Sequence, residues 1–181
     1  MKGKLIAVSG PSGVGKGTIV KTLITRRADV VESVSCTTRA PRPGEIDGKH
    51  YFFISQEEFD RRIAENGFLE YNAHFENRYG TPKSFVEKSL QSKHVILEIE
   101  VDGALKAKAS MPECILVMIV PPSVEELRAR LTKRNTEGKE EIENRLSRLD
   151  YELSKKDLYD YVIVNDDLET AIAELSAIID K

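Results

Sequence analysis

Residues 10–18, Gly-Pro-Ser-Gly-Val-Gly-Lys-Gly-Thr, have the composition and spacing of a phosphate-binding loop. An apolar run at 5–8 precedes them and a helical pattern follows from Ile19, which is the order of strand, loop and helix that such a loop requires. Glycines permit positive φ, so successive N–H groups can point into one hollow at a helix N-terminus, where the helix dipole also favours an anion. Lys16 would add its charge to the β and γ phosphates of a nucleotide. The expected nucleotide-binding residues are Gly10, Pro11, Ser12, Gly13, Val14, Gly15, Lys16, Gly17 and Thr18.

One position departs from the usual motif. The residue after the lysine, normally a serine or threonine, is Gly17, and Thr18 comes one place later. We therefore expect Mg2+ to be held by Thr18, by water and by phosphate oxygens, because this ion takes oxygen ligands and keeps several waters. The protein ligands of the metal stay open at this point. A glycine-rich turn beside a surface lysine is the alternative interpretation of the whole segment.

A second candidate anion site lies in the basic loop at 39–44. Arg39 and Arg42 belong to this loop, and two prolines fix φ within it, so it cannot be helical. Two guanidinium groups held on a stiff loop suit bidentate binding of a monophosphate, to which the phenols of Tyr51 and Tyr79 could also donate. A solvated basic loop, with the tyrosines in the core, is the alternative.

Two acidic residues end a predicted core strand. Glu98 and Glu100 are two apart, so their side chains share one face of that strand. Close to a phosphate loop they could orient an acceptor nucleotide and hold Mg2+ through water. A helix cap or a salt bridge at the sheet edge is the alternative for Glu98.

Arginines recur between residues 126 and 156. Arg130 and Arg134 are four apart and therefore share one helix face, and Arg145 lies on the next predicted helix with Arg148 three residues later. Phosphoryl transfer needs positioning and neutralisation of the oxygens of the moving group, and arginines on a closing lid supply both while excluding water. We expect Arg148 to pair with the acids around it.

The elements that must position these residues alternate between strands and helices. Strand patterns fall at residues 5–8, 32–39, 51–54, 68–75, 94–100, 114–120 and 161–164. Helical patterns fall at 19–26, 55–66, 102–110, 123–134, 140–156 and 167–180, with a further helix that Thr81 caps and Pro82 begins. The alternation predicts an α/β fold of three layers around a parallel sheet, with ligands at the carboxyl ends of its strands. Residues 36–81 are expected to form a small mixed insertion.

The composition is that of one globular domain of 181 residues, 40% hydrophobic and 31% charged. A net charge of −3 predicts no general attraction to nucleic acid. Cys36 and Cys114 have no metal-ligand spacing around them and are expected to be free thiols of a reducing compartment. No apolar stretch reaches the roughly 18 residues of a membrane span, so we expect a cytoplasmic protein without a membrane segment.

Motifs distributed along nearly the whole chain resemble the guanylate kinase family. They are Gly-Pro-Ser-Gly-x-Gly-Lys at 10–16, Ser-Val-Ser-x-Thr-Thr-Arg at 33–39, Pro-Arg-Pro-Gly at 41–44 with Gly48 and Tyr51, Tyr-Gly at 79–80, Arg-Leu-x-x-Arg at 130–134 and Ile-Val-Asn-Asp-Asp at 163–167. The resemblance implies transfer of the γ-phosphoryl of ATP to GMP, and also to dGMP, with Mg2+. It further implies a core at 1–34, 82–125 and 157–181, a GMP-binding insertion at 35–81 and a mobile helical lid at 126–156.

The resemblance also assigns roles to individual residues. Guanine presents N1–H and N2–H side by side and one carboxylate accepts both, whereas adenine offers no such pair. Glu70 matches the family's guanine-reading glutamate, Ser35 its hydroxyl donor to O6, and Thr81 a small hydroxyl residue near the base. The GMP phosphate would be bound by Arg39, Arg42, Tyr51 and Tyr79. The transferred phosphoryl group would be contacted by Lys16, Arg39, Arg130, Arg134 and Arg145, with the adenine of ATP near Arg134 and Asn165.

Other interpretations remain at this stage. Gly-Lys-Gly-Thr also occurs in adenylate kinases, so another nucleoside monophosphate kinase is one alternative, against which Ser35 and Glu70 argue. A non-catalytic guanylate-kinase-like module that binds phosphopeptides is another, although such modules lack a working phosphate loop. Many relatives carry aspartate where this chain has Glu98 and Glu100, which leaves their separate roles open. The turn at 165–166 reads equally well as the N-cap of the last helix. The oligomeric state is not predicted.

Overall fold

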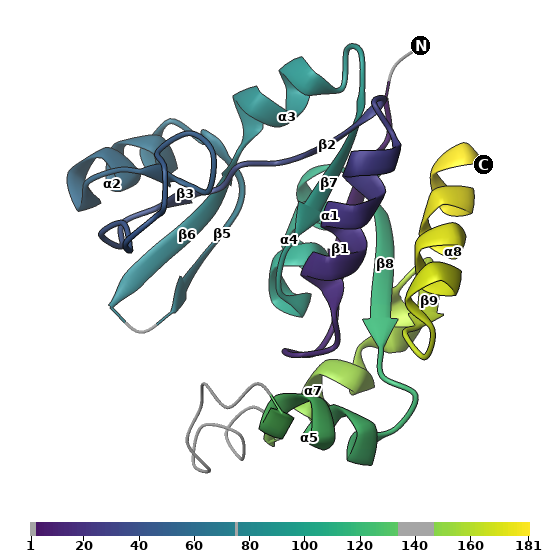
Figure 1. Cartoon of the computed structure of the whole chain (residues 1–181). Helices are drawn as coiled ribbons and strands as arrows, with labels where there is room; N and C mark the ends of the chain where they lie inside the picture. The colour runs from purple at the N-terminus through teal and green to yellow at the C-terminus, as the bar shows by residue number, and fades with distance from the viewer. Residues whose placement is uncertain (1–2, 75, 134–146) are drawn as a thin grey trace.

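The computed structural model describes residues 3–74, 76–133 and 147–181, without the side chains of 74 and 130–133. Five parallel strands of the described chain form the core sheet in the order β2-β7-β1-β8-β9 (Figure 1). These strands are β1 (Leu5–Ser9), β2 (Val30–Glu32), β7 (His94–Glu98), β8 (Ile115–Val120) and β9 (Tyr161–Val164). The predicted parallel α/β core is confirmed.

Helices cover both faces of this sheet, which explains why β1 and β8 are apolar almost throughout. In β1, Ile6 and Val8 point to one face and pack with α1 (Lys16–Arg26) and α8 (Leu168–Asp180). Leu5 and Ala7 point to the other face, toward α3 (Lys83–Ser89) and α4 (Val101–Ser110). Both faces of the strand are therefore buried, and the carboxyl end of β1 is held rigidly where the phosphate loop begins.

A second sheet lies beside the core and forms the insertion (Figure 1). It contains β3 (Cys36–Thr37), β4 (Phe52–Phe53), β5 (Phe68–His74) and β6 (Asn77–Pro82), in the order β4-β3-β6-β5. β3 pairs in parallel with β4, and β6 pairs antiparallel with both β3 and β5. The helix α2 (Gln56–Ala64) buries Phe59 against Cys36 and Phe68, which gives the insertion a small core of its own.

Two features of the insertion differ from the sequence-based expectation. The predicted strand at 32–39 is two short strands in different sheets, because β2 pairs with β7 while β3 pairs with β4 and β6. The proposed cap at Thr81 is wrong, since Thr81 lies within β6, Pro82 is the N-cap and α3 begins at Lys83. Pairing with neighbouring strands overrides the local helix-start pattern here.

Helices α5 (Val124–Lys133) and α7 (Leu149–Ser154) follow the carboxyl end of β8 (Figure 1). The side chain of Ser123 caps the start of α5, with the Glu126 N–H donating to Ser123 Oγ at 3.0 Å. Leu127 of α5 packs with Leu149 and Leu153. A short 3-10 helix, Lys156–Leu158, then leads back to β9. The described helices include none that is both long and apolar enough to cross a membrane.

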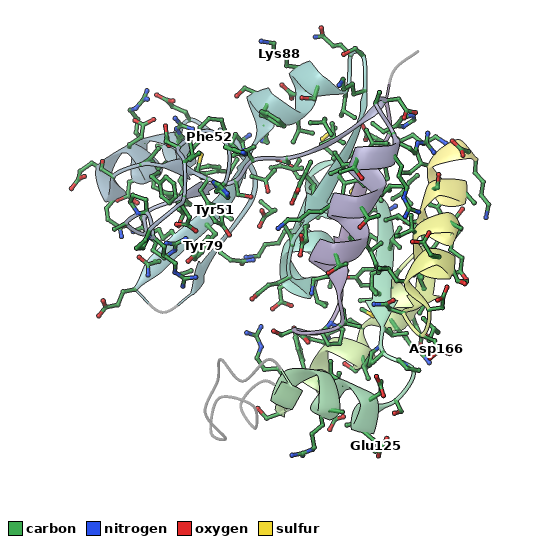
Figure 2. All side chains as sticks on the ribbon, viewed as in Figure 1. Tyr51, Phe52, Tyr79, Lys88, Glu125 and Asp166 are labelled. Carbon is green, nitrogen blue, oxygen red and sulfur yellow. The ribbon has the colours of Figure 1, made fainter. Side chains whose placement is uncertain are left out.

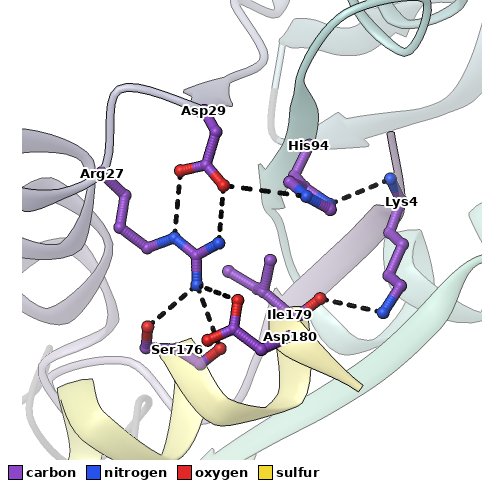
Figure 3. A network of polar contacts seen from close by, with 7 residues as sticks. All are labelled: Lys4, Arg27, Asp29, His94, Ser176, Ile179 and Asp180. Atoms are coloured by element: carbon purple, nitrogen blue, oxygen red, sulfur yellow. Dashed lines mark hydrogen bonds and ion pairs between the residues drawn. The ribbon is translucent and has the colours of Figure 1, made fainter. Parts of the chain in front are cut away.

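A polar network ties α8 to the amino-terminal edge of the core sheet (Figure 3). Arg27, just after α1, binds Asp29 at 2.6 Å and Asp180 at 2.7 Å. Lys4 donates its backbone N–H to His94 Nδ1 and its Nζ to the Ile179 carbonyl. The network stabilises the end of the sheet at which the strands begin, opposite the end that carries the phosphate loop.

Candidate nucleotide-binding site

The loop after β1 takes its shape from glycines. Gly10, Gly13 and Gly15 have φ of 138°, 84° and 102°, values that other residues rarely adopt. At Gly10 a Cβ would also lie 2.0 Å from the Ile119 carbonyl oxygen, so the loop passes too close to β8 for any side chain. The chain then enters α1 at Lys16 with Gly15 as N-cap, so the loop leads directly into a helix N-terminus, which favours an anion.

Asn165 supports this loop from the end of β9. Its Nδ2 donates to the Val14 carbonyl oxygen at 2.7 Å, and a Cβ on Gly15 would lie 2.5 Å from the same nitrogen. The side chain is buried between the two segments. The N-cap interpretation of the turn at 165–166 is wrong, because Asp167 caps α8 by accepting the Thr170 N–H at 2.8 Å.

Lys16 is folded back onto its own loop. Its Nζ donates to the carbonyl oxygens of Gly10 at 2.6 Å and Pro11 at 3.1 Å. Burial lowers the pKa of Lys16, and the nearby carboxylates, with Glu98 the foremost, oppose that effect. The ammonium group is therefore partly desolvated and held in place before any phosphate arrives.

Two hollows meet at Lys16. The first, which we call the loop hollow, has a volume of about 390 Å³ and is lined by Ser12, Gly13, Gly15, Lys16, Gly17, Thr18, Lys21 and Glu98. The second, the intersheet hollow, has a volume of about 330 Å³ and is lined by Lys16, Ser35, Tyr51, Glu70, Asn72, Tyr79, Glu98, Ile99 and Glu100. Lys16 and Glu98 line both, so groups bound in the two hollows would face each other across these side chains.

Glu70 is a buried acid in the wall of the intersheet hollow, with 7% of its surface exposed. Thr81 donates its hydroxyl to Glu70 Oε1 at 2.6 Å across the β5–β6 pair. Burial raises the pKa of Glu70, while the Thr81 hydrogen bond and the charge of Lys106 oppose the rise. Ser35 lines the same hollow from the crossing between the sheets. The site therefore offers a carboxylate and hydroxyls in a hollow that is partly open to solvent.

The predicted basic site is partly assembled. Tyr51 and Tyr79 lie together on the second sheet (Figure 2), with ring centroids 5.9 Å apart, and the Arg39 guanidinium lies 5.6 Å from the Tyr51 centroid. Glu45 holds that guanidinium by two hydrogen bonds of 2.9 and 3.0 Å. Arg42 is exposed, and its backbone N–H donates to the same carboxylate at 2.7 Å. A phosphate at Arg39 would therefore meet a guanidinium that already has a carboxylate partner.

The acids after β7 lie in the same region as the loop. β7 ends at Glu98 and Glu100 is the N-cap of α4, so the prediction that both lie on one face of a strand is wrong. Both nevertheless line the intersheet hollow, together with Ile99 between them. Glu100 pairs with Arg148 at 3.5 Å, which agrees with the expected pairing of Arg148. A Cβ on Gly17 would lie 3.3 Å from both carboxylate oxygens of Glu98, so the position that lacks a hydroxyl faces this acid instead.

The donors around Gly17 suit a hard cation. The Thr18 hydroxyl and the Glu98 carboxylate line one hollow, and Mg2+ is commonly bound by one or two carboxylates with phosphate oxygens and water. The described residues hold no group of three or more acidic, histidine or cysteine side chains that could bind a metal unaided. Any Mg2+ here would therefore depend on the nucleotide for most of its ligands.

The lid arginines can be placed only in part. Arg130 belongs to α5, with its side chain outside the described structure, and Arg134 and Arg145 lie outside the described residues altogether.

Several residues in and around the site were not predicted. Glu45 holds Arg39, Asn72 lines the intersheet hollow, and the buried Glu152 of α7 contributes to the electrostatic environment of Lys16. An acid three residues after Arg42 was the one local signal for Glu45. Asn72 and Glu152 come together with the site through tertiary packing, which the sequence pattern does not reveal.

The comparisons with known proteins agree on one family. The family model described as "Guanylate kinase" matches residues 2–181. The chain is 51% identical over 179 residues to the guanylate kinase of Caldanaerobacter subterraneus subsp. tengcongensis, covering 98% of this chain and 87% of that protein. It is 49% identical to that of Wolbachia sp. subsp. Brugia malayi, covering 99% and 93%. The crystal structure of guanylate kinase from Anaplasma phagocytophilum superposes with a TM-score of 0.77 at 35% identity, covering 98% and 85%.

Proposed function

The chain belongs to the guanylate kinase family and is an ATP:GMP phosphotransferase, and we propose that the loop hollow and the intersheet hollow hold its two nucleotides. The observation that carries this proposal is that Lys16 and Glu98 line both hollows. Direct transfer requires donor and acceptor to meet in line, and a shared wall is where a phosphoryl group would pass.

The loop hollow receives the phosphates of ATP. The loop from Gly10 to Thr18 donates backbone N–H groups, and Lys16 exchanges its carbonyl partners for phosphate oxygens. This exchange is favourable because a charge-assisted bond to an anion is stronger than one to a neutral carbonyl. Asn165 fixes the loop through Val14, beside the turn against which the adenine packs.

The intersheet hollow receives GMP. Glu70 accepts N1–H and N2–H of guanine, Ser35 donates to O6, and Thr81 keeps the carboxylate oriented. The phosphate of GMP is bound by Arg39, Arg42, Tyr51 and Tyr79. Part of the hydrogen bonding between Glu45 and Arg39 is replaced by hydrogen bonds from Arg39 to the phosphate. Glu98 and Glu100 orient the acceptor nucleotide from the core side. A base without the two adjacent N–H donors leaves the buried carboxylate with Thr81 as its remaining partner, so we expect AMP to be rejected.

Magnesium is the cofactor that the donor set fits. Thr18 and Glu98 would hold it together with the phosphates, Glu98 directly or through water. When bound, it neutralises charge on the β and γ oxygens of ATP.

The domain roles follow from the same assignment. Residues 35–81 bind GMP, residues 126–156 close over ATP, and the remaining segments form the core. Arg130, Arg134 and Arg145 neutralise the phosphoryl group while closure excludes water. The buried free thiols of Cys36 and Cys114 are compatible with a reducing cytoplasmic location.

A coupled ADP-release assay across GMP, dGMP, AMP, UMP and CMP tests the assignment. Activity is expected with GMP and dGMP alone. Glu70→Ala should lower kcat/KM for GMP by about a hundredfold, because it removes two charge-assisted hydrogen bonds. Glu87→Ala, an exposed change on α3, is the matched control. Unchanged GMP preference in Glu70→Ala would refute this residue as the base reader.

A further inference from the structure

Helix α4 of the core packs against strand β5, which carries the residue proposed to read the base. A Cβ built on Gly103 would lie 3.1 Å from Glu70 Oε2 and 3.6 Å from the carboxylate carbon. The same position is 3.5 Å from Asn72 Nδ2. The φ of Gly103 is not in the left-handed region, so the backbone conformation does not require glycine here. The limited space beside Glu70 is the reason for glycine at this position.

Lys106 lies three residues later, on the same face of α4. Its Nζ donates to the Tyr71 carbonyl oxygen at 3.0 Å and also to Asn72 Oδ1. Burial raises the pKa of Glu70, and the positive charge of Lys106 opposes that rise and so favours the ionised carboxylate. Gly103 and Lys106 thus bracket residues 70–72 from the core side.

The carboxylate has little freedom to move away from this helix. Thr81 binds Oε1 at 2.6 Å from the neighbouring strand, and Glu70 is 7% exposed. Added bulk at residue 103 would therefore displace the carboxylate by a few tenths of an ångström and strain its bond to Thr81.

We propose that Gly103 and Lys106 are positioning residues that hold the carboxylate of Glu70 where it can accept both N–H groups of guanine. They would thereby determine how strongly the enzyme prefers guanine to hypoxanthine as the acceptor base. The proposal rests on the assignment of Glu70 as base reader. Hypoxanthine keeps the N1–H and O6 of guanine but lacks the N2 amino group. A carboxylate placed for both donors favours GMP over IMP, and a displaced carboxylate loses the advantage of the second donor.

Steady-state kinetics with GMP and IMP test this in Gly103→Ala and Lys106→Met. Each variant should lower kcat/KM for GMP about tenfold, change that for IMP much less and leave the KM for ATP unchanged, because the catalytic geometry is sensitive to small displacements. The helix preference of alanine and the crowding beside Glu70 act on stability in opposite directions, so the melting temperature of Gly103→Ala is measured to establish that the variant is folded. Lys108→Met is the matched control, since Lys108 is on the same helix but binds the Cys114 carbonyl, away from β5.

The outcomes separate this inference from the proposed function. Equal losses with GMP and IMP, or an unchanged GMP:IMP ratio in both variants, would overturn the role of Gly103 and Lys106. The same GMP and IMP kinetics measured for Glu70→Ala test the assignment of the base reader separately. If Glu70→Ala loses the GMP:IMP preference while the α4 variants keep it, only the inference about α4 fails; if Glu70→Ala also keeps it, the assignment of the base reader fails first.

Discussion

Asn165 donates its side-chain N–H to the carbonyl oxygen of Val14 at 2.7 Å, across 151 residues of sequence. The bond joins the end of β9 to the middle of the phosphate loop, which also lies close to β8 at Gly10 and accepts hydrogen bonds from Lys16. A buried carbonyl without a donor is costly, so the loop's shape depends on a residue near the C-terminal end of the sheet. The phosphate loop is thus a product of the folded core as well as of its local sequence.

Replacing Asn165 by alanine should weaken ATP binding. The change leaves the Val14 carbonyl unpaired, at a cost of about 1–3 kcal/mol, and lets the loop relax away from its binding shape. We expect the KM for ATP to rise about tenfold, with a small change in the KM for GMP. Steady-state kinetics with each substrate varied in turn measure both. Glu174→Ala, at an exposed position of α8, is the control, and an equal rise in both KM values would contradict the prediction.

Lys16 should be essential for turnover but not for acceptor binding. Lys16→Ala removes the charge that faces the transferred group, and we expect kcat to fall at least about a hundredfold. GMP binding, measured by calorimetry, should stay within a few-fold of the original because the base and phosphate contacts come from the insertion. Lys88→Ala, at an exposed lysine of α3 (Figure 2), is the control. Loss of GMP binding in Lys16→Ala would place the lysine in the acceptor site instead.

The sequence was most informative where structure is set by short-range pattern. The order of strand, glycine loop and helix at 5–26, and the apolar β8, follow from periodicity and local backbone requirements. β6 was missed because Asn77–Pro82 contains glycine, proline and polar residues, and its extended form depends on pairing with β3 and β5. For the same reason Thr81 was taken for a cap, whereas its hydroxyl binds Glu70.

The residues of the site also divide into those that a local sequence pattern predicts and those that depend on tertiary packing. Lys16 and Glu98 were singled out from the sequence because their positions after predicted strands carry chemical meaning, and the structure brings both to the same hollows. The partners that hold them were not found, because the contact of Gly103 with Glu70 and the hold of Glu45 on Arg39 arise only after folding. Sequence patterns therefore predicted several of the groups that line the hollows, and tertiary packing determines how they are held.

Glu98 should govern the requirement for magnesium. Glu98→Gln removes the carboxylate that faces Gly17 and keeps its size, so the Mg2+ concentration for half-maximal activity should rise about tenfold or more. The Mg2+-dependent rise in melting temperature with a non-hydrolysable ATP analogue gives a readout without turnover. Glu113→Gln, at an exposed acid beyond α4, is the control. An unchanged Mg2+ requirement would leave Thr18, water and the phosphates as the ligands.

The pH dependence of GMP use should report the ionisation of Glu70. Burial raises the pKa of Glu70, and reading guanine requires the ionised form, so the KM for GMP should rise as pH falls through that raised pKa. The Thr81 hydroxyl favours the ionised form, and Thr81→Val should therefore move this rise to higher pH.

The raised pKa of Glu70 affects the stability of the free protein in the opposite direction. Acid pH weakens the binding of GMP but increases the contribution of Glu70 to the free energy of unfolding. A carboxyl whose pKa is raised on folding contributes stability that is full below its unfolded pKa and is lost as pH rises through its folded pKa. Glu70→Gln should remove both effects, because an amide does not titrate. The effect on substrate use is measured by the KM values for GMP and ATP at a series of acidic to neutral pH values. The effect on stability is measured by the midpoint of denaturant unfolding at the same pH values. An identical pH profile of the GMP KM in the original protein and in Thr81→Val would show that the hydroxyl does not control this carboxylate.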